Sequence, residues 1–160
     1  MTLHLLTFFL AIILLLVFFQ DLKKRTIHVG LPILIFLLAL IINYISPGLT
    51  FSVILYNIAF VCINIIGLTL YFSFKSKILI NPIDTFIGLG DIVFFLALTP
   101  LFSLKPFIMF FILGLLFSLL IHSVLLIFKR VKTIPLAGYL SIFIVVNILA
   151  KNIFKINTLL

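Results

Sequence analysis

Carboxylates are scarce in this chain, and two of them lie where chemistry would be expected. The 160-residue sequence holds three acidic residues, Asp21, Asp84 and Asp91, and no Glu. Asp21 and Asp91 each lie where a long apolar run meets polar residues, in Gln20-Asp21-Leu22-Lys23-Lys24-Arg25 and in Gly88-Leu89-Gly90-Asp91. A carboxylate at the edge of an apolar span is costly to keep and is a functional-site hypothesis by default. Two such residues suggest a carboxylate pair.

A pair of carboxyl groups can hydrolyse a peptide bond without a metal ion. Two acids in one site do not ionise together easily, so one of them keeps its proton. The ionised partner draws a proton from water while the protonated one donates to the scissile carbonyl. Asp21 and Asp91 are therefore candidate catalytic residues, and we expect no cofactor or metal. The dipole of a helix that begins near Asp91 favours that residue as the first to ionise.

The composition is typical of a protein that lies in a membrane. Hydrophobic residues make up 66% of the chain and charged residues 9%, whereas soluble domains have roughly half and about a quarter. The net charge is +8, but the basic residues are dispersed at the ends of apolar runs. We therefore expect membrane lipid, and no nucleic acid, as a partner. The single Cys62 excludes a disulfide and a thiol redox pair. We expect one domain over residues 1–160.

Apolar runs separated by polar loops predict an all-α membrane protein with six transmembrane helices. A helix needs about 20 apolar residues to cross the hydrocarbon core. Gln20–His28 forms a polar hinge after the first run, and the fourth run is short for a span. The expected spans are about Leu3–Phe19, Val29–Ile45, Phe51–Phe74, Asp91–Leu104, Pro106–Phe128 and a last one that ends near Ala150.

The basic residues predict the orientation of these helices. The loops after the first, third and fifth spans hold eight Lys and Arg residues, whereas the opposite side holds three, which are Lys105, Lys151 and Lys155. Because the cytoplasmic side carries the excess of positive charge, we expect both termini outside. The chain would then be a multi-pass protein of the inner (plasma) membrane, with all three aspartates on the cytoplasmic side.

The glycines before Asp91 suggest a close approach of the backbone to a substrate. Glycine permits φ > 0 and leaves room beside the main chain, so an extended substrate could lie against Gly88 and Gly90 while Asp91 points at it. Structural interpretations stay open for both aspartates. Asp91 could be the N-cap of the fourth helix, and Asp21 a solvated acid at the membrane interface.

Three short segments together carry a resemblance to a known family. They are Asp21 with Ile27 six positions on, Gly88-Leu89-Gly90-Asp91, and Ile134-Pro135-Leu136-Ala137-Gly138-Tyr139-Leu140. In this order they resemble the type IV prepilin peptidase family, which consists of membrane aspartic proteases with a Gly-x-Gly-Asp motif. With one Cys and no further domain, the chain resembles the short form without the Cys-containing methyltransferase domain.

The resemblance implies both an activity and a set of site residues. It places the catalytic aspartates at Asp21 and Asp91, with Gly88 and Gly90 as supporting residues. By the same resemblance, Pro135 and Gly138, which most simply mark the turn into the last span, would help shape the floor of the site. The implied substrates are prepilin-like membrane proteins, cut on the cytoplasmic side between a basic leader and the hydrophobic helix that follows.

The sequence departs from the family's usual pattern at two places. Ile27-His28-Val29 stands where Ile-Pro-Asn is usual, and Val93 stands where a basic residue usually follows the second aspartate. Both departures bear on contacts with the substrate. Two alternatives therefore stay open: a non-catalytic polytopic membrane protein, such as an assembly subunit or a small transporter, and an inactive member of the peptidase family.

Other polar residues have simpler interpretations. Asp84 follows Asn81-Pro82 and is expected to be a turn acid. His122, within the fifth apolar run, is expected to be a hydrogen-bonded packing residue. Asn57 and Asn64 are seven positions apart, so they share one helix face and predict hydrogen bonds to a neighbouring helix.

Overall fold

The computed structural model describes residues 2–45, 49–77, 87–128 and 134–154, apart from the side chains of residues 128 and 151–154. This part of the chain is helical, as the sequence predicts. It forms six α-helices and one short 3₁₀-helix: α1 (Thr2–Lys24), α2 (Gly30–Ile45), α3 (Phe51–Ser76), α4 (Leu89–Ala97), η1 (Thr99–Leu101), α5 (Leu104–Phe128) and α6 (Leu136–Phe154).

The first helix runs further than the apolar pattern indicates. α1 continues through the expected hinge to Lys24, with Lys23 and Lys24 in its last turn. Gln, Leu and Lys are good helix formers, and lysines near a helix C-terminus interact favourably with its dipole. Asp21 therefore lies inside the last turns of α1 and not in a loop.

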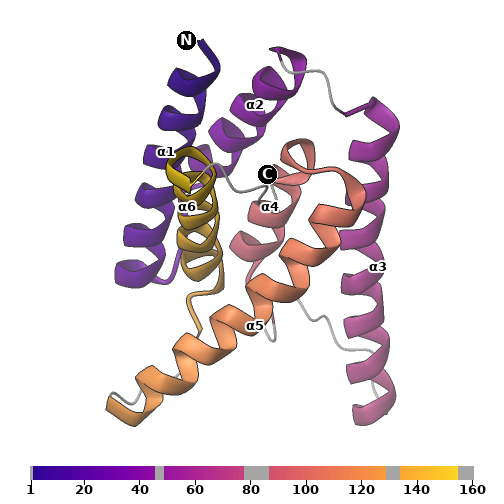
Figure 1. Ribbon diagram of the computed structural model, residues 1–160. Coiled ribbons are helices and arrows are strands. Elements are labelled where there is room, and N and C mark those ends of the chain that lie inside the picture. Colours follow the sequence, from indigo (N-terminus) through magenta and orange to yellow (C-terminus); the bar gives the residue numbers. More distant parts are fainter. Residues whose placement is uncertain (1, 46–48, 78–86, 129–133, 155–160) are drawn as a thin grey trace.

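Consecutive helices run in opposite directions, so that α1, α3 and α5 end on one side of the molecule (Figure 1). α1, α2 and α6 form one group, α3 stands at the opposite side, and α4 lies between them. α6 packs most extensively against α1 and also contacts α4 and α5. The beginning of α6 therefore lies at the same side of the molecule as the end of α1 and the beginning of α4.

A core of tightly packed side chains fixes α1, α2, α4 and α6 relative to one another. Leu14, Ile35, Phe94 and Leu140 belong to one buried cluster and are fully buried. At the contact between α5 and α6, a Cβ atom on Gly114 would collide with the side chain of Leu140. Glycine at that position allows the two helices to approach closely, as small residues do between membrane helices.

The fourth helix is short, and α3 donates hydrogen bonds to the segment that follows it, which contains η1. α4 has nine residues, which corresponds to about 14 Å, well below the roughly 30 Å of the hydrocarbon core. The buried Asn57 side chain of α3 donates 2.9 and 2.8 Å hydrogen bonds to the carbonyl oxygens of Thr99 and Phe102. The interhelical bond expected for Asn57 is thus confirmed, whereas the expectation for Asn64 is wrong, because its amide donates to Phe60 of its own helix.

In the part of the chain that the structure describes, three helices are long and apolar enough to cross a membrane, by length and composition. They are α1, α3 and α5. Large apolar side chains are exposed along their outer faces, for example Phe8 and Phe74, which are 62% and 81% exposed. Exposed apolar surface on this scale is characteristic of a protein in contact with lipid.

Candidate active site

Asp21 reaches α6 from the last turns of α1. Its side chain is 6% exposed, and its Oδ2 atom accepts a 2.7 Å hydrogen bond from the backbone N–H of Gly138. The interpretation of Asp21 as a solvated interface acid is therefore wrong. A buried carboxylate is maintained only when donors compensate for the loss of water, and here a backbone amide of α6 supplies part of that compensation.

Asp91 reaches the same end of α6 from α4. Its Oδ1 atom accepts a 2.9 Å hydrogen bond from the backbone N–H of Ala137. The N-cap of α4 is Gly88, and Asp91 lies in the first turn three positions later. The backbone N–H of Gly88 also donates to its carboxyl group, as in the reciprocal part of a capping box. Asp91 is therefore not the N-cap of α4, and its carboxyl group is shared between its own helix and α6.

The carboxyl groups of Asp91 and Asp21 are thus bound by the backbone N–H groups of two successive residues. Ala137 and Gly138 lie in the first turn of α6, which begins at Leu136. The first N–H groups of a helix have no partner within the helix and carry the positive end of its dipole. Because each amide holds one carboxylate, the beginning of α6 fixes Asp21 and Asp91 side by side. Pro135, just before the helix, marks the start of α6 as the sequence indicates.

Gly138 and Gly88 leave space for the two carboxyl groups, because glycine has no Cβ atom. A Cβ atom on Gly138 would lie 3.1 Å from Oδ2 and 3.3 Å from Cβ of Asp21. A Cβ atom on Gly88 would lie 3.1 Å from Oδ2 of Asp91. No glycine in the described residues has a positive φ, and Gly88 is extended, with φ −67° and ψ 138°. Neither Gly88 nor Gly90 uses the positive φ that glycine permits, and Gly88 leaves space for the carboxylate of Asp91.

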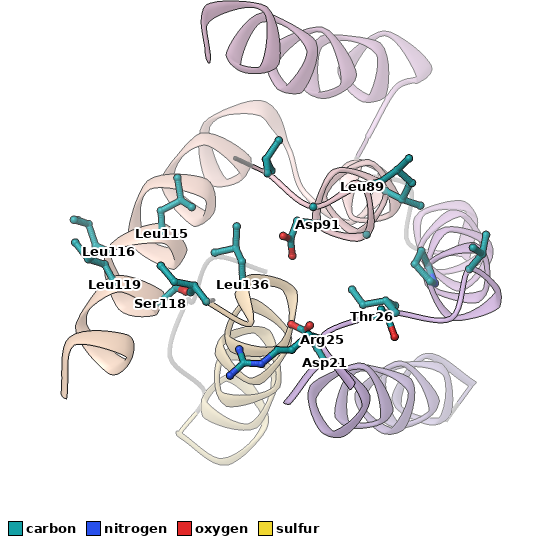
Figure 2. A pocket seen from close by; sticks show the side chains of 18 residues that line it. Asp21, Arg25, Thr26, Leu89, Asp91, Leu115, Leu116, Ser118, Leu119 and Leu136 are labelled. Atoms are coloured by element: carbon teal, nitrogen blue, oxygen red, sulfur yellow. The ribbon is translucent and has the colours of Figure 1, made fainter. Parts of the chain in front are cut away.

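A pocket of about 990 Å³ opens beside the carboxyl groups (Figure 2). Asp21, Arg25 and Asp91 are the charged residues that line it within the part of the chain that the structure describes. Ile87, Gly88 and Gly90 line it beside Asp91. Apolar side chains also line it, among them Val93, Leu115, Leu116, Leu119, Ile134 and Leu136. The pocket therefore joins two carboxyl groups to an apolar surface on α5.

A comparison with known families gives a match. The sequence profile of the type IV leader peptidase family matches residues 8–124. The chain belongs to the type IV leader peptidase family. No curated protein and no solved structure matches it. The segment that matches the leader peptidase family contains both aspartates and Gly88, and it ends before Ala137 and Gly138.

The two departures from the leader peptidase pattern have structural counterparts. His28, where the family usually has Pro, accepts a 3.2 Å hydrogen bond at Nδ1 from the backbone N–H of Gly30, the first residue of α2. Its own N–H donates to Oε1 of Gln20 at 2.7 Å, which ties the connection back to α1. Val93, where the family usually has a basic residue, contributes to the apolar wall of the pocket.

The remaining candidates divide into residues near the pocket and residues elsewhere. Asp84 lies outside the described residues. Ser118 lines the pocket from α5, and its hydroxyl is buried without a hydrogen-bond partner among the described residues. One turn further on, His122 is buried, as expected of a packing residue, and its Nδ1 has no hydrogen-bond partner among the described residues. No three His, Cys, Asp or Glu side chains of the described chain are grouped as a metal site requires.

Sequence reasoning missed the amide donors of Ala137 and Gly138, and it missed Arg25 and Ser118 as residues that line the pocket. A backbone N–H carries no signature in its residue type, so the signal available was the position of the Pro135–Gly138 segment at the start of a helix. For Arg25 the spacing of four positions after Asp21 is no sufficient signal, because Arg25 follows the end of α1 in a left-handed conformation.

Proposed function

We propose that this chain is a membrane-embedded aspartic endopeptidase that removes the basic leader from prepilin-like membrane proteins. Asp21 and Asp91 are the proposed catalytic pair, and Gly88 and Gly90 the supporting residues. Membership of the type IV leader peptidase family supports this substrate class. The observation that carries the proposal is the fixing of both carboxyl groups by the successive amides of Ala137 and Gly138.

This observation favours a catalytic role for Asp21 and Asp91 over a purely structural one. The two aspartates come from helices far apart in the sequence, yet both project into one pocket. Two carboxyl groups brought together in a partly buried site repel one another when both are ionised. A fold that needed only helix caps would not bring them together, so the arrangement is better explained by a shared function.

The proposed reaction uses one carboxyl group as base and the other as acid. The ionised carboxylate takes a proton from a water molecule, whose oxygen attacks the carbonyl carbon of the scissile peptide bond. The protonated carboxyl group donates its proton to the carbonyl oxygen, which gives a neutral tetrahedral intermediate. When this intermediate collapses, the C–N bond breaks, the leaving nitrogen gains a proton, and the new carboxyl terminus forms.

The two sides of the pocket suit the two parts of such a substrate. Gly88 is extended and exposed beside Asp91, so a substrate backbone in extended form can lie along it. Leu115, Leu116 and Leu119 of α5 provide an apolar wall for the beginning of the hydrophobic segment that follows a leader. Val93 enlarges that wall, and it contacts apolar substrate atoms in place of a basic group.

For the membrane, we propose six spans with both termini outside and the site on the cytoplasmic side of the inner (plasma) membrane. The alternating helix directions support this arrangement (Figure 1), as does the excess of Lys and Arg in the loops after α1, α3 and α5. The short α4 and the η1 turn after it would be shielded from lipid by protein, since Phe94, Phe95, Thr99 and Pro100 are buried. Asn57 satisfies the carbonyl groups of Thr99 and Phe102 in the segment after α4.

Cleavage by the purified chain tests the proposal. The chain would be reconstituted in lipid with a synthetic substrate that carries a basic leader followed by one apolar helix. Mass spectrometry of the products should locate a single cut at the junction of leader and helix. A control substrate with its helix intact and its leader placed at the other end should stay whole. Absence of any cut in the first substrate would contradict the proposed activity and favour an inactive family member.

A further inference from the structure

Arg25 ends α1 in a conformation that turns its side chain toward the pocket. It has φ 56°, in the left-handed region, and its backbone N–H donates a 3.0 Å hydrogen bond to the carbonyl oxygen of Asp21. Left-handed residues commonly end helices, but glycine usually occupies that position because other residues are strained there. Lys77 ends α3 in the same way, with φ 57°. The backbone turn is therefore an ordinary helix ending, and the side chain distinguishes Arg25.

The side chain of Arg25 lines the pocket, whereas those of its basic neighbours do not. Arg25 lines the pocket together with Asp21, and Figure 2 shows both side chains at the same edge of it, beside α6. The positive charge of Arg25 interacts electrostatically with both Asp21 and Tyr139. Arg25, Lys23 and Lys24 are all exposed, but Lys23 and Lys24 are absent from the pocket lining. The three neighbours in sequence thus have different surroundings.

The carboxyl groups of Asp21 and Asp91 have similar uncharged hydrogen-bond donors, but their charged neighbours differ. Each accepts a backbone N–H from the beginning of α6. Around Asp21, the titratable and charged groups in the described chain are Arg25 at the end of α1, Tyr139 on α6 and Asp91 on α4. α2 contributes no charged residue. Beside Asp91, Asp21 is the charged neighbour in this part of the structure.

We infer that Arg25 is a positioning residue that keeps Asp21 as the ionised member of the pair. This inference rests on the proposed function in one respect, the roles of the two acids: Asp21 is then the general base that takes the proton from water, and Asp91 is the acid that donates to the carbonyl oxygen. A full positive charge outweighs the partial charge of a helix end, and both carboxyl groups already share the beginning of α6. The order is the reverse of the one that the dipole of α4 alone favours.

The scarcity of acids makes this order directly measurable. With ¹³C-labelled aspartate, the chain gives side-chain carboxyl signals from three residues, which Asp→Asn variants assign by NMR in micelles. In the otherwise unaltered chain, Asp21 should lose its proton at a lower pH than Asp91. In an Asp91→Asn background Asp21 titrates alone, so that the coupling between the two acids no longer complicates the curve.

Substitutions at Arg25 and Lys24 then test whether the charge of Arg25 causes this order of deprotonation. In the Asp91→Asn background, Arg25→Gln should raise the titration midpoint of Asp21 by about one pH unit, and Arg25→Lys should restore most of the difference. Lys24→Gln removes the same charge from an exposed neighbour outside the pocket and should leave the midpoint unchanged. Arg25→Lys keeps the charge, so it also shows whether any change in Arg25→Gln reflects misfolding.

Two results would overturn the inference. In one, Asp91 deprotonates first in the unaltered chain. In the other, Lys24→Gln moves the midpoint of Asp21 as far as Arg25→Gln does. The titration needs no substrate, so it separates this inference from the proposed function. A chain that titrates as expected but cuts no prepilin-like substrate would refute the proposed activity alone. A chain that cuts its substrate while Asp91 ionises first would refute the role of Arg25 alone.

Discussion

Oδ2 of Asp21 accepts a 2.7 Å hydrogen bond from the backbone N–H of Gly138, which lies 117 positions further along the chain. This bond joins the last turns of α1 to the first turn of α6, between the two helices that make the most extensive contact in the molecule. The neighbouring N–H of Ala137 holds Asp91 in the same way. The site is therefore built on one helix end, and small changes there should affect both carboxyl groups.

Gly138→Ala should lower kcat/KM for leader cleavage by about 10- to 100-fold. The added Cβ would lie 3.1 Å from Oδ2 of Asp21 and 3.5 Å from the carbonyl oxygen of Phe18, so the carboxylate would have to move. Gly67→Ala in α3, where a Cβ would meet nothing within 4 Å, is the matched control and should cleave normally. Steady-state kinetics with both variants measure the difference, and equal rates would contradict the importance of this contact.

Gly88 and Gly90 should respond differently to alanine. A Cβ on Gly88 would lie 3.1 Å from Oδ2 of Asp91, whereas one on Gly90 would make ordinary contacts of 3.5–3.7 Å with Ile27. Gly88→Ala should therefore lower the cleavage rate by about tenfold, and Gly90→Ala should stay close to the unaltered chain. The reverse order in a cleavage assay would mean that Gly90, not Gly88, makes room at the site.

The sequence predicted the meeting of the two aspartates but not what holds them. Asp21 ends one apolar run and Asp91 begins another of opposite direction, so their common depth follows from the pattern of spans. Gly138 could be recognised as part of a helix start, but its N–H donor belongs to the backbone, which looks the same at every residue. The role of Gly88 was not settled by the sequence, which does not distinguish a glycine that bends the chain from one that leaves space; its φ of −67° indicates the second. The rotation of Arg25 into the pocket depends on where α1 ends, and helix ends are the least predictable part of a helix.

Asn57→Leu should destabilise the protein by about 1–3 kcal/mol. The substitution leaves the buried carbonyl groups of Thr99 and Phe102 without the donor that now lies 2.9 and 2.8 Å away. Asn64→Leu is the control in the same helix, since Asn64 is exposed and bonds only within α3; its effect should stay within about 0.5 kcal/mol. Thermal unfolding in detergent compares the two, and similar stability of both variants would contradict the bracing role of Asn57.

Reporter fusions test the proposed topology. Fusions after Arg25, Lys77 and Lys132 should report a cytoplasmic location, because these loops carry the excess of positive charge. Fusions after Gly48 and at the C-terminus should report an external one. A cytoplasmic C-terminus would contradict six spans and would indicate that α4, with its nine residues, enters the membrane without crossing it.

Loss of cleavage in Asp21→Asn and Asp91→Asn is the most direct measure of the central claim, that these two residues form a catalytic pair. Asparagine keeps the shape of the side chain but cannot exchange the proton, so each variant should insert normally and should leave the leader uncut. Asp84→Asn is the matched control, which removes the third carboxyl group of the chain and should retain most of the activity. The measurement is product formation in reconstituted membranes at equal protein level. Cleavage that persists in either the Asp21 or the Asp91 variant, or that disappears in the Asp84 variant alone, would contradict the assignment of the pair.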